Sequence, residues 1–170
     1  MNDFVVLVDL FDRRIGQLPK LEAHHHGKLH RAFSVFIYHE GKLLVQRRAA
    51  HKYHSAGLWA NTCCSHPRPE ESLEEAARRR LMEEAGIDCP LQEIGSFVYR
   101  AILDNCLSEY EIDHVFAGEY GGAFTRNAEE ADEMRFVDMQ WLAQDMTEHP
   151  EGYAVWFITA YPLFMQALGM

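Results

Sequence analysis

The feature that most constrains the fold is one well-delimited helix near the middle of the chain. Ser72 stands three residues before Glu75, a spacing that forms a capping box at a helix N-terminus. Apolar residues then recur at helical spacing, Gly86 stands where a C-terminal glycine cap belongs, and Pro90 follows soon after. This pattern predicts a helix over residues 73–85.

The inward face of this helix carries charge. Glu84 lies eleven positions after Leu73, which at about 100° per residue brings the two side chains to within roughly 20° of each other. Arg80 is also nearly in line with Leu73. Buried charge is costly unless it is paired or binds a metal. The sequence alone leaves two interpretations open, a structural Arg80–Glu84 pair at i,i+4 spacing or a binding site.

The segments around the helix alternate between strand-like and helix-like patterns. Two apolar runs flank His39, Glu40 and Gly41, which predicts a β-hairpin. A turn is expected over residues 12–16, and a last helix over 153–167 with a bend near Pro162. The expected strands are 4–8, 32–38, 42–47, 94–101, 109–118 and 134–139. This order predicts an α+β fold, an α/β/α sandwich with a mixed sheet flanked by helices.

Length and charge exclude several classes of protein. The 170 residues predict a single domain over residues 1–170. The formal net charge of −10 argues against binding to nucleic acid or to an anionic membrane. No apolar run approaches the roughly 18–20 residues of a membrane span, and the N-terminus lacks a signal-peptide pattern. We therefore expect a cytoplasmic protein with four reduced thiols, at Cys63, Cys64, Cys89 and Cys106.

Two carboxylates alternate along one expected strand. Glu109 and Glu111 lie two residues apart and therefore point to the same face of the sheet. They could ligate one cation or share a proton, or they could simply form a solvated strand face. Residues 115–117 are apolar, which indicates that the strand continues into the core and weakens the solvated-face interpretation.

Histidines are unusually frequent, and four of them fall within residues 24–30. Neutral imidazoles together with carboxylates suit a mixed N/O site for Zn, Mn or Fe. A lone histidine is more often a polar filler than a ligand, and His24, His30 and His66 have no zinc-finger spacing, so by themselves they are a weak signal for a metal site. Cys64 is likewise compatible with an inert buried thiol.

Basic residues cluster against the acidic background of the chain. Arg47 and Arg48 lie at the end of an expected strand, and Lys52 follows four residues after Arg48. With Lys20 and Arg80 they could bind a diphosphate through forked and point-charge contacts. The alternative is a hairpin end that carries solubilising charge.

The segment from Glu71 to Ile87 resembles a Nudix box, the signature of the Nudix superfamily. The motif Arg-x-apolar-x-Glu-Glu-x-Gly-apolar is present from residue 79 onward. Two positions depart from the pattern: Ser65 replaces the opening glycine, and Arg80 replaces a glutamate that Nudix hydrolases use in holding magnesium. This replacement argues against hydrolysis and favours diphosphate binding.

Longer segments are similar to one branch of that superfamily, the type I isopentenyl diphosphate isomerases. The resemblance extends from about Val8 to Trp156. Its most specific part is the Trp-x-Asn-x-x-Cys-x-His-Pro segment that begins at Trp59. Further matching segments lie at 20–24, 29–34, 46–49, 99–101 and 109–111.

The resemblance implies a reaction and a catalytic pair. Members of the family interconvert isopentenyl and dimethylallyl diphosphate in isoprenoid biosynthesis, by protonation and deprotonation through a carbocation. Cys64 and Glu111 match the catalytic cysteine and glutamate, and Tyr99 matches a tyrosine beside that glutamate. Which of the two groups protonates the substrate first stays open, as does the oligomeric state.

The resemblance also implies two metal ions and a substrate-binding set. The ligands of a divalent ion (Mn, Zn or Mg) are matched by His24, His30, His66, Glu109 and Glu111. Glu84 and the backbone carbonyl of Cys64 match the surroundings of a magnesium ion that accompanies the substrate diphosphate. The substrate contacts are matched by Lys20, Arg48, Lys52, Arg80 and Trp156. A Nudix pyrophosphohydrolase of a nucleoside or prenyl diphosphate, and a non-catalytic metal-binding domain, are the alternative interpretations.

Overall fold

A computed structural model describes residues 3–103 and 107–170 of the chain. The strands are β1 (Phe4–Val8), β2 (Arg14–Pro19), β3 (His30–His39), β4 (Lys42–Arg48), β5 (Trp59–Ala60), β6 (Cys63–Ser65), β7 (Gln92–Ile102), β8 (Ser108–Glu119) and β9 (Ala131–Asp138). The helices are α1 (Lys20–His25), α2 (Leu73–Ala85), α3 (Met139–Glu148), the short 3-10 helix η2 (Pro150–Gly152) and α4 (Val155–Ala167).

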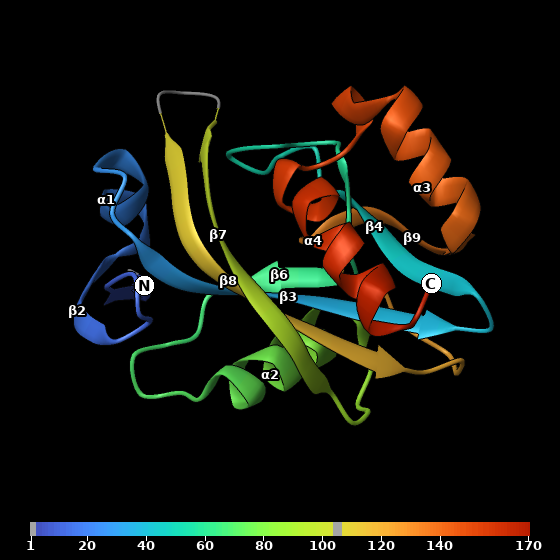
Figure 1. The fold of residues 1–170 in the computed structure, drawn as a ribbon, viewed down its shortest axis with the longest axis horizontal. Coiled ribbons are helices and arrows are strands. Elements are labelled where there is room, and N and C mark those ends of the chain that lie inside the picture. The colour runs from blue at the N-terminus through green and yellow to red at the C-terminus, as the bar shows by residue number, and fades with distance from the viewer. Residues whose placement is uncertain (1–2, 104–106) are drawn as a thin grey trace.

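Strand β3 is the centre of a mixed sheet (Figure 1). It pairs antiparallel with β1, β4 and β6 and parallel with β8. Strand β2 extends the sheet from β1, β7 extends it from β8, and β5 and β9 both pair with β4. Every segment that pairs with β3 is thereby held in a fixed register with it.

The two faces of β3 pack against different helices. Phe33, Val35 and Ile37 lie in one buried cluster with the apolar side of α2. Phe36 points the other way and stacks on Phe164 of α4, with 4.7 Å between the ring centroids. Figure 1 shows α2 and α4 on opposite sides of β3. The expected α+β arrangement, a mixed sheet flanked by helices, is confirmed.

The α4-facing side of the sheet changes character along the strands. At one end it is apolar, where Phe36 and Val115 belong to the core cluster under α4. At the other end the same face carries buried polar groups, among them His30, Glu111 and Asp113. Because side chains alternate with a period of two, one strand face supplies both core and polar site.

The central helix and the hairpin are confirmed. Helix α2 has the complete capping box, because Ser72 Oγ accepts the N–H of Glu75 while the Glu75 carboxylate accepts the N–H of Ser72. Gly86 closes the helix in the left-handed conformation, with φ of 64°. Strands β3 and β4 pair around residues 39–41 as expected. The last helix runs through Pro162 from residue 155 to 167.

The expectation of a turn at residues 12–16 is wrong. Strand β2 already begins at Arg14, and the turn lies earlier, because Asp9 Oδ1 accepts the N–H groups of Phe11 and Arg13. These side-chain bonds place the turn over residues 9–13, earlier than the expected range. Helices α1 and α3 and the short strands β5 and β6 were not expected from the sequence.

Cys63, Cys64 and Cys89 are free thiols, whereas Cys106 lies outside the described residues. Within the described ranges, no helix is both long and apolar enough to cross a bilayer.

The capping box generates a prediction for stability. Replacing Ser72 with alanine leaves the N–H of Glu75 at the first turn of α2 without its side-chain acceptor, and we expect a loss of about 1 kcal/mol in the free energy of unfolding. Urea unfolding followed by circular dichroism measures it. Ser72→Thr keeps the cap and serves as the control. Equal stability of Ser72→Ala and wild type would contradict the role of the cap.

Candidate active site

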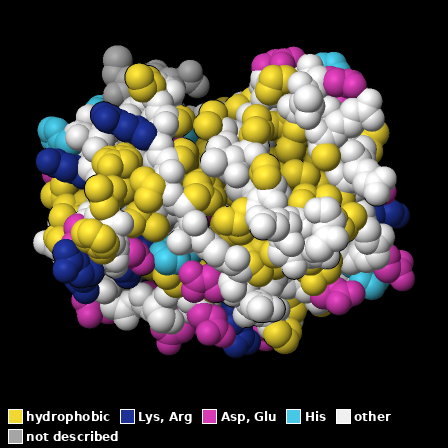
Figure 2. Space-filling model, in the orientation of Figure 1, with side chains coloured by type: hydrophobic (Ala, Val, Ile, Leu, Met, Phe, Trp, Pro, Cys, Tyr) yellow, Lys and Arg dark blue, Asp and Glu magenta, His cyan; other side chains and the backbone are white. Residues whose placement is uncertain are grey.

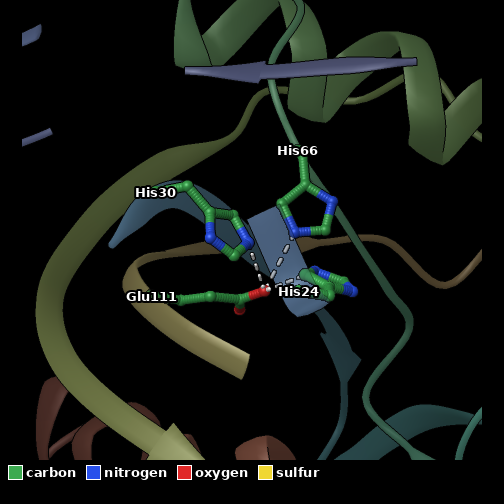
Figure 3. Close-up of side chains that lie close together, drawn as sticks. All are labelled: His24, His30, His66 and Glu111. Atoms are coloured by element: carbon green, nitrogen blue, oxygen red, sulfur yellow. Dashed lines mark hydrogen bonds and ion pairs between the residues drawn. The ribbon is translucent and has the colours of Figure 1, made fainter. Parts of the chain in front are cut away.

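Three imidazoles and one carboxylate from four separate segments of the chain converge at the polar end of the sheet (Figure 3). His24 comes from α1, His30 opens β3, His66 follows β6, and Glu111 lies in β8. Glu111 Oε1 lies 2.9 Å from His66 Nε2, 3.1 Å from His30 Nε2 and 3.9 Å from His24 Nε2. One ligand atom of each residue lies within 4.8 Å of the others. The four residues form what we call the His/Glu cluster.

The cluster suits a divalent metal ion. Burial lowers the pKa of His24 to about 3 and that of His66 to about 4, so both rings are neutral at physiological pH. A neutral imidazole is the form that ligates a metal. His24 Nε2 is buried and has no hydrogen-bond partner among the described residues. Such an orphaned nitrogen, facing a carboxylate, is explained by a cation between them.

Hydrogen bonds behind the cluster orient its members. His30 Nδ1 lies 2.7 Å from the backbone oxygen of Lys28, which directs Nε2 toward Glu111. Burial acts to raise the pKa of Glu111, but the hydrogen bonds from His30 and His66 outweigh it and hold that pKa well below the usual range. Glu111 is therefore a carboxylate.

Glu109 lies outside the His/Glu cluster. Its Oε2 accepts from the Tyr99 hydroxyl at 2.5 Å, and its Oε1 lies 3.5 Å from His54 Nε2. Burial, with the neighbouring Glu111 carboxylate, raises the pKa of Glu109 to about 8. The Tyr99 hydroxyl also lies 3.1 Å from Glu111 Oε2 and so bridges the two carboxyl groups. The ligand role of Glu109 stays a prediction.

The two adjacent cysteines point to opposite faces of the sheet. Cys63 is fully buried in the cluster under α2, whereas Cys64 lines the cavity on the α4 side. Cys64 pairs with Ser34 across β6 and β3, which puts both side chains on the same face as the polar site. Burial raises the pKa of the Cys64 thiol to about 12, so the group carries its proton at neutral pH.

One cavity of about 220 Å³ is lined by Cys64, by His66 and Glu111 of the His/Glu cluster, and by several cationic side chains. Its acidic side is formed by Glu109, Glu111 and Asp113. All five residues expected to contact substrate line the same cavity: Lys20, Arg48, Lys52, Arg80 and Trp156. Side chains scattered over the whole chain are thereby brought into a single site, which we call the active-site pocket.

The cations in the pocket are held by specific partners. Lys52 Nζ lies 2.5 Å from Glu130 Oε2, and Arg80 Nη2 lies 3.1 Å from Glu130 Oε1. The Arg80–Glu84 pair considered from the helical pattern is present, and Glu84 also accepts from Gln46 Nε2. Burial acts to lower the pKa of Arg80, but Glu84 and Glu130 raise it strongly, so the guanidinium stays charged.

Trp156 forms a wall of the pocket and is almost fully buried. Its indole N–H donates to Asn61 Oδ1 at 3.2 Å, and Asn61 Nδ2 donates to the backbone oxygens of Val35 and Cys63. The Arg48 guanidinium lies 5.1 Å from the Trp156 ring centroid. Asn61 thus joins the indole to the backbone that carries the cysteines.

Sequence reasoning missed several pocket residues. Asp113 continues the alternation of Glu109 and Glu111 by one more step, so the strand period could have found it. Tyr53 and His54 lie in an irregular segment, where no periodicity indicates which way a side chain points. Glu130 lies in the segment just before β9, and no sequence pattern there indicated that its side chain enters the pocket.

Comparisons with known proteins identify the family of the chain. The chain matches the NUDIX domain family over residues 28–157. It is 54% identical to isopentenyl-diphosphate delta-isomerase 1 of Aromatoleum aromaticum, over 92% of this chain and 89% of that protein. The chain belongs to the isopentenyl-diphosphate delta-isomerase family of Nudix proteins. Isopentenyl-diphosphate delta-isomerase 2 of Photorhabdus laumondii is 50% identical over 92% of this chain and 89% of its own length.

Solved structures show the same fold at low sequence identity. The DR0079 protein of Deinococcus radiodurans has a TM-score of 0.78 at 15% identity, over 94% of this chain and 98% of its own. The MutT protein of Methanosarcina mazei Go1 has a TM-score of 0.67 at 20% identity, over 84% and 96%. These likenesses show the fold alone, because sequence identities this low do not carry function from one protein to another.

The His/Glu cluster generates a prediction for metal binding. We expect His24→Asn to weaken the binding of Mn²⁺ or Zn²⁺ by at least about 100-fold, because one of four converging ligands is lost. Titration calorimetry of metal-free protein measures the affinity. The matched control is His26→Asn, two residues away on the same helix end but exposed. Equal affinity in both variants would remove His24 from the site.

Proposed function

We propose that this protein isomerises isopentenyl diphosphate to dimethylallyl diphosphate, with Cys64 and Glu111 as its acid–base pair. The observation that carries the proposal is the active-site pocket itself, in which a protonated thiol and an ionised carboxylate share one cavity with four cations. Family membership indicates the reaction. The pocket contains groups that could transfer the protons and groups that could bind the diphosphate.

The reaction needs two groups with separated proton affinities. A proton must be added to the terminal alkene carbon, which leaves a tertiary cation, and a proton must then leave the carbon on the other side of it. Cys64 and Glu111 differ in pKa as this requires. Cys64 pairs with Ser34 of β3 and Glu111 pairs with His30 of β3, so the two residues lie on opposite sides of β3 and four positions apart along it. Both side chains line the active-site pocket.

The carbocation must be kept from water, which would trap it as an alcohol. The indole of Trp156 and the ring of Tyr99 line the pocket and offer π-electrons to a positive centre. A desolvated cation–π contact stabilises the cation by about 2 kcal/mol. Both rings are buried, so water has little access from their side.

A divalent ion, Mn, Zn or Mg, would be held by His24, His30, His66 and Glu111, with Glu109 beside them. When bound there, the ion fixes the orientation of the Glu111 carboxylate and lowers its basicity. The carboxylate oxygen that remains accepts from the Tyr99 hydroxyl. Tyr99 thereby keeps Glu111 oriented toward the pocket.

The cationic end of the pocket is assigned to the diphosphate. Lys20, Arg48, Lys52 and Arg80 supply charge-assisted contacts, and Glu84 with the Cys64 carbonyl would hold a magnesium ion that enters with the substrate. Binding energy from the diphosphate then positions the reacting carbons. The hydrolase alternative is less well supported, because Arg80 occupies a Nudix-box position where hydrolases carry a glutamate.

The test is to incubate metal-loaded protein with isopentenyl diphosphate in deuterated water and to follow products by NMR and mass spectrometry. The proposal predicts dimethylallyl diphosphate that carries solvent deuterium. Release of phosphate or pyrophosphate without the isomer would instead establish the hydrolase.

Single variants test the acid–base pair. We expect Cys64→Ala and Glu111→Gln each to give folded protein with at least about 1,000-fold lower isomerase activity, because proton transfer of this kind contributes about 10²–10⁴-fold. The matched control is Cys63→Ala, whose side chain points into the core. Near wild-type activity in Cys64→Ala or Glu111→Gln would remove that residue from the pair.

The diphosphate contacts generate a separate prediction. We expect Lys52→Met to raise KM for isopentenyl diphosphate by about 10–100-fold, since a hydrogen bond to a charged group contributes about 1.5–3 kcal/mol. Steady-state kinetics measures KM and kcat separately. Lys42→Met, at an exposed position on β4, is the control. Identical KM values in the two variants would exclude Lys52 from substrate binding.

A further inference from the structure

A second, smaller cavity of about 90 Å³ lies beside the active-site pocket. We call it the side pocket. The residues common to both cavities include Lys20, Ser65, His66 and Arg80. Two arginines, Arg68 and Arg79, line the side pocket and not the active-site pocket. They have no place in the acid–base chemistry or in the diphosphate contacts described above.

The side pocket is strongly basic within an acidic protein. Four cationic side chains line it, and its one carboxylate, Asp3, belongs to an exposed residue. Arg79 is held by Glu71, with nitrogen–oxygen distances of 2.6 and 2.9 Å, so its position is fixed and its charge is partly compensated. This fixed guanidinium forms one wall.

Arg68 differs from the other cations in the side pocket. Its backbone N–H donates to Glu71 Oε2 at 3.1 Å, which fixes the chain at this point. Its guanidinium makes no hydrogen bond or ion pair with any residue of the described ranges. Five donors in a rigid fork therefore remain available at the cavity.

His66 lines both cavities and carries a buried ring nitrogen that has no partner among the described residues. His66 Nε2 faces Glu111, and Nδ1 lies on the side of the ring away from Glu111 (Figure 3). Nδ1 is buried without a partner among the described residues. When Nε2 ligates a metal, the neutral ring carries its proton on Nδ1, and such a proton is normally donated to an oxygen.

We propose that the side pocket binds one phosphoryl group, with Arg68 and Arg79 as its specific contacts and His66 Nδ1 as a further donor. A tetrahedral oxyanion accepts from several directions at once, which matches guanidinium, ammonium and imidazole donors placed around one small space. The volume is far below the roughly 300–1,000 Å³ of sites for drug-sized ligands, so the occupant is a single phosphoryl group and not a nucleotide.

The phosphoryl group has two sources with the same chemistry. It is either the outer phosphate of the bound substrate or a free inorganic phosphate that sits beside the substrate. The assignment rests on the proposed function only in that His66 is taken as a metal ligand. Phosphate binding is measured without turnover, so failure of the isomerase activity and failure of the side pocket are separate results.

The test measures binding of inorganic phosphate to metal-loaded protein by calorimetry and ³¹P NMR. We expect Arg68→Gln to weaken phosphate binding at least about tenfold, as loss of one charge-assisted contact requires. The matched control is Arg78→Gln, an exposed arginine that pairs with Asp88 and does not line the pocket. Arg68→Lys, which keeps the charge, should recover part of the affinity. Equal phosphate affinity in Arg68→Gln, Arg78→Gln and wild type would overturn the proposal.

Kinetics then distinguishes the two sources. If the outer phosphate of the substrate occupies the side pocket, phosphate competes with isopentenyl diphosphate and Arg68→Gln raises KM. If free phosphate occupies it, substrate and phosphate bind together, and KM in Arg68→Gln stays at the wild-type value. Either result, together with weakened phosphate binding in Arg68→Gln, supports the proposal that the side pocket binds a phosphoryl group.

Discussion

The structure depends on one constraint, the convergence of three imidazoles on a single buried oxygen of Glu111. A buried carboxylate is costly unless it is paired, and here the pairing groups come from α1, β3 and the segment after β6. Strand β3 makes this convergence possible, because it pairs with both β6 and β8 and fixes their registers. Helix α1 reaches the cluster through His24, so the cluster joins this N-terminal helix to strands β3 and β8.

Because side chains alternate between the two faces of the sheet, neighbouring residues have different roles: one packs in the core and the next faces the pocket. Cys63 fills the core under α2, and Cys64 faces the pocket one position later. Along β8, Glu111 lies at the polar end of the face on which Val115 packs under α4. A shift of register by one residue would put every one of these side chains on the wrong face. Asn61, which bonds both the β3 backbone and Trp156, resists such a shift.

Local signals predicted the local structure, and little beyond it. The helix at 73–85 was predicted to its ends because each cap, Ser72 with Glu75 and then Gly86, is set by residues at that end of the helix. The sequence pattern could not bring His24 and Glu111 together, because 87 positions separate them; only resemblance to a known family placed them in one site. His54 was missed because its segment has no period. The turn was misplaced because the bonds that fix it come from the Asp9 side chain, which lies before the expected range.

X-ray absorption spectroscopy of the metal-loaded protein tests the central claim most directly, because it identifies the ligand atoms of the bound ion. The account predicts a shell of nitrogen and oxygen only, with the multiple-scattering signature of three imidazoles. Substitution of His24 should reduce that signature to two. A sulfur ligand at about 2.3 Å from a bound zinc, or a shell without imidazoles, would contradict the account, since Cys64 would then be a metal ligand and not a free thiol acid.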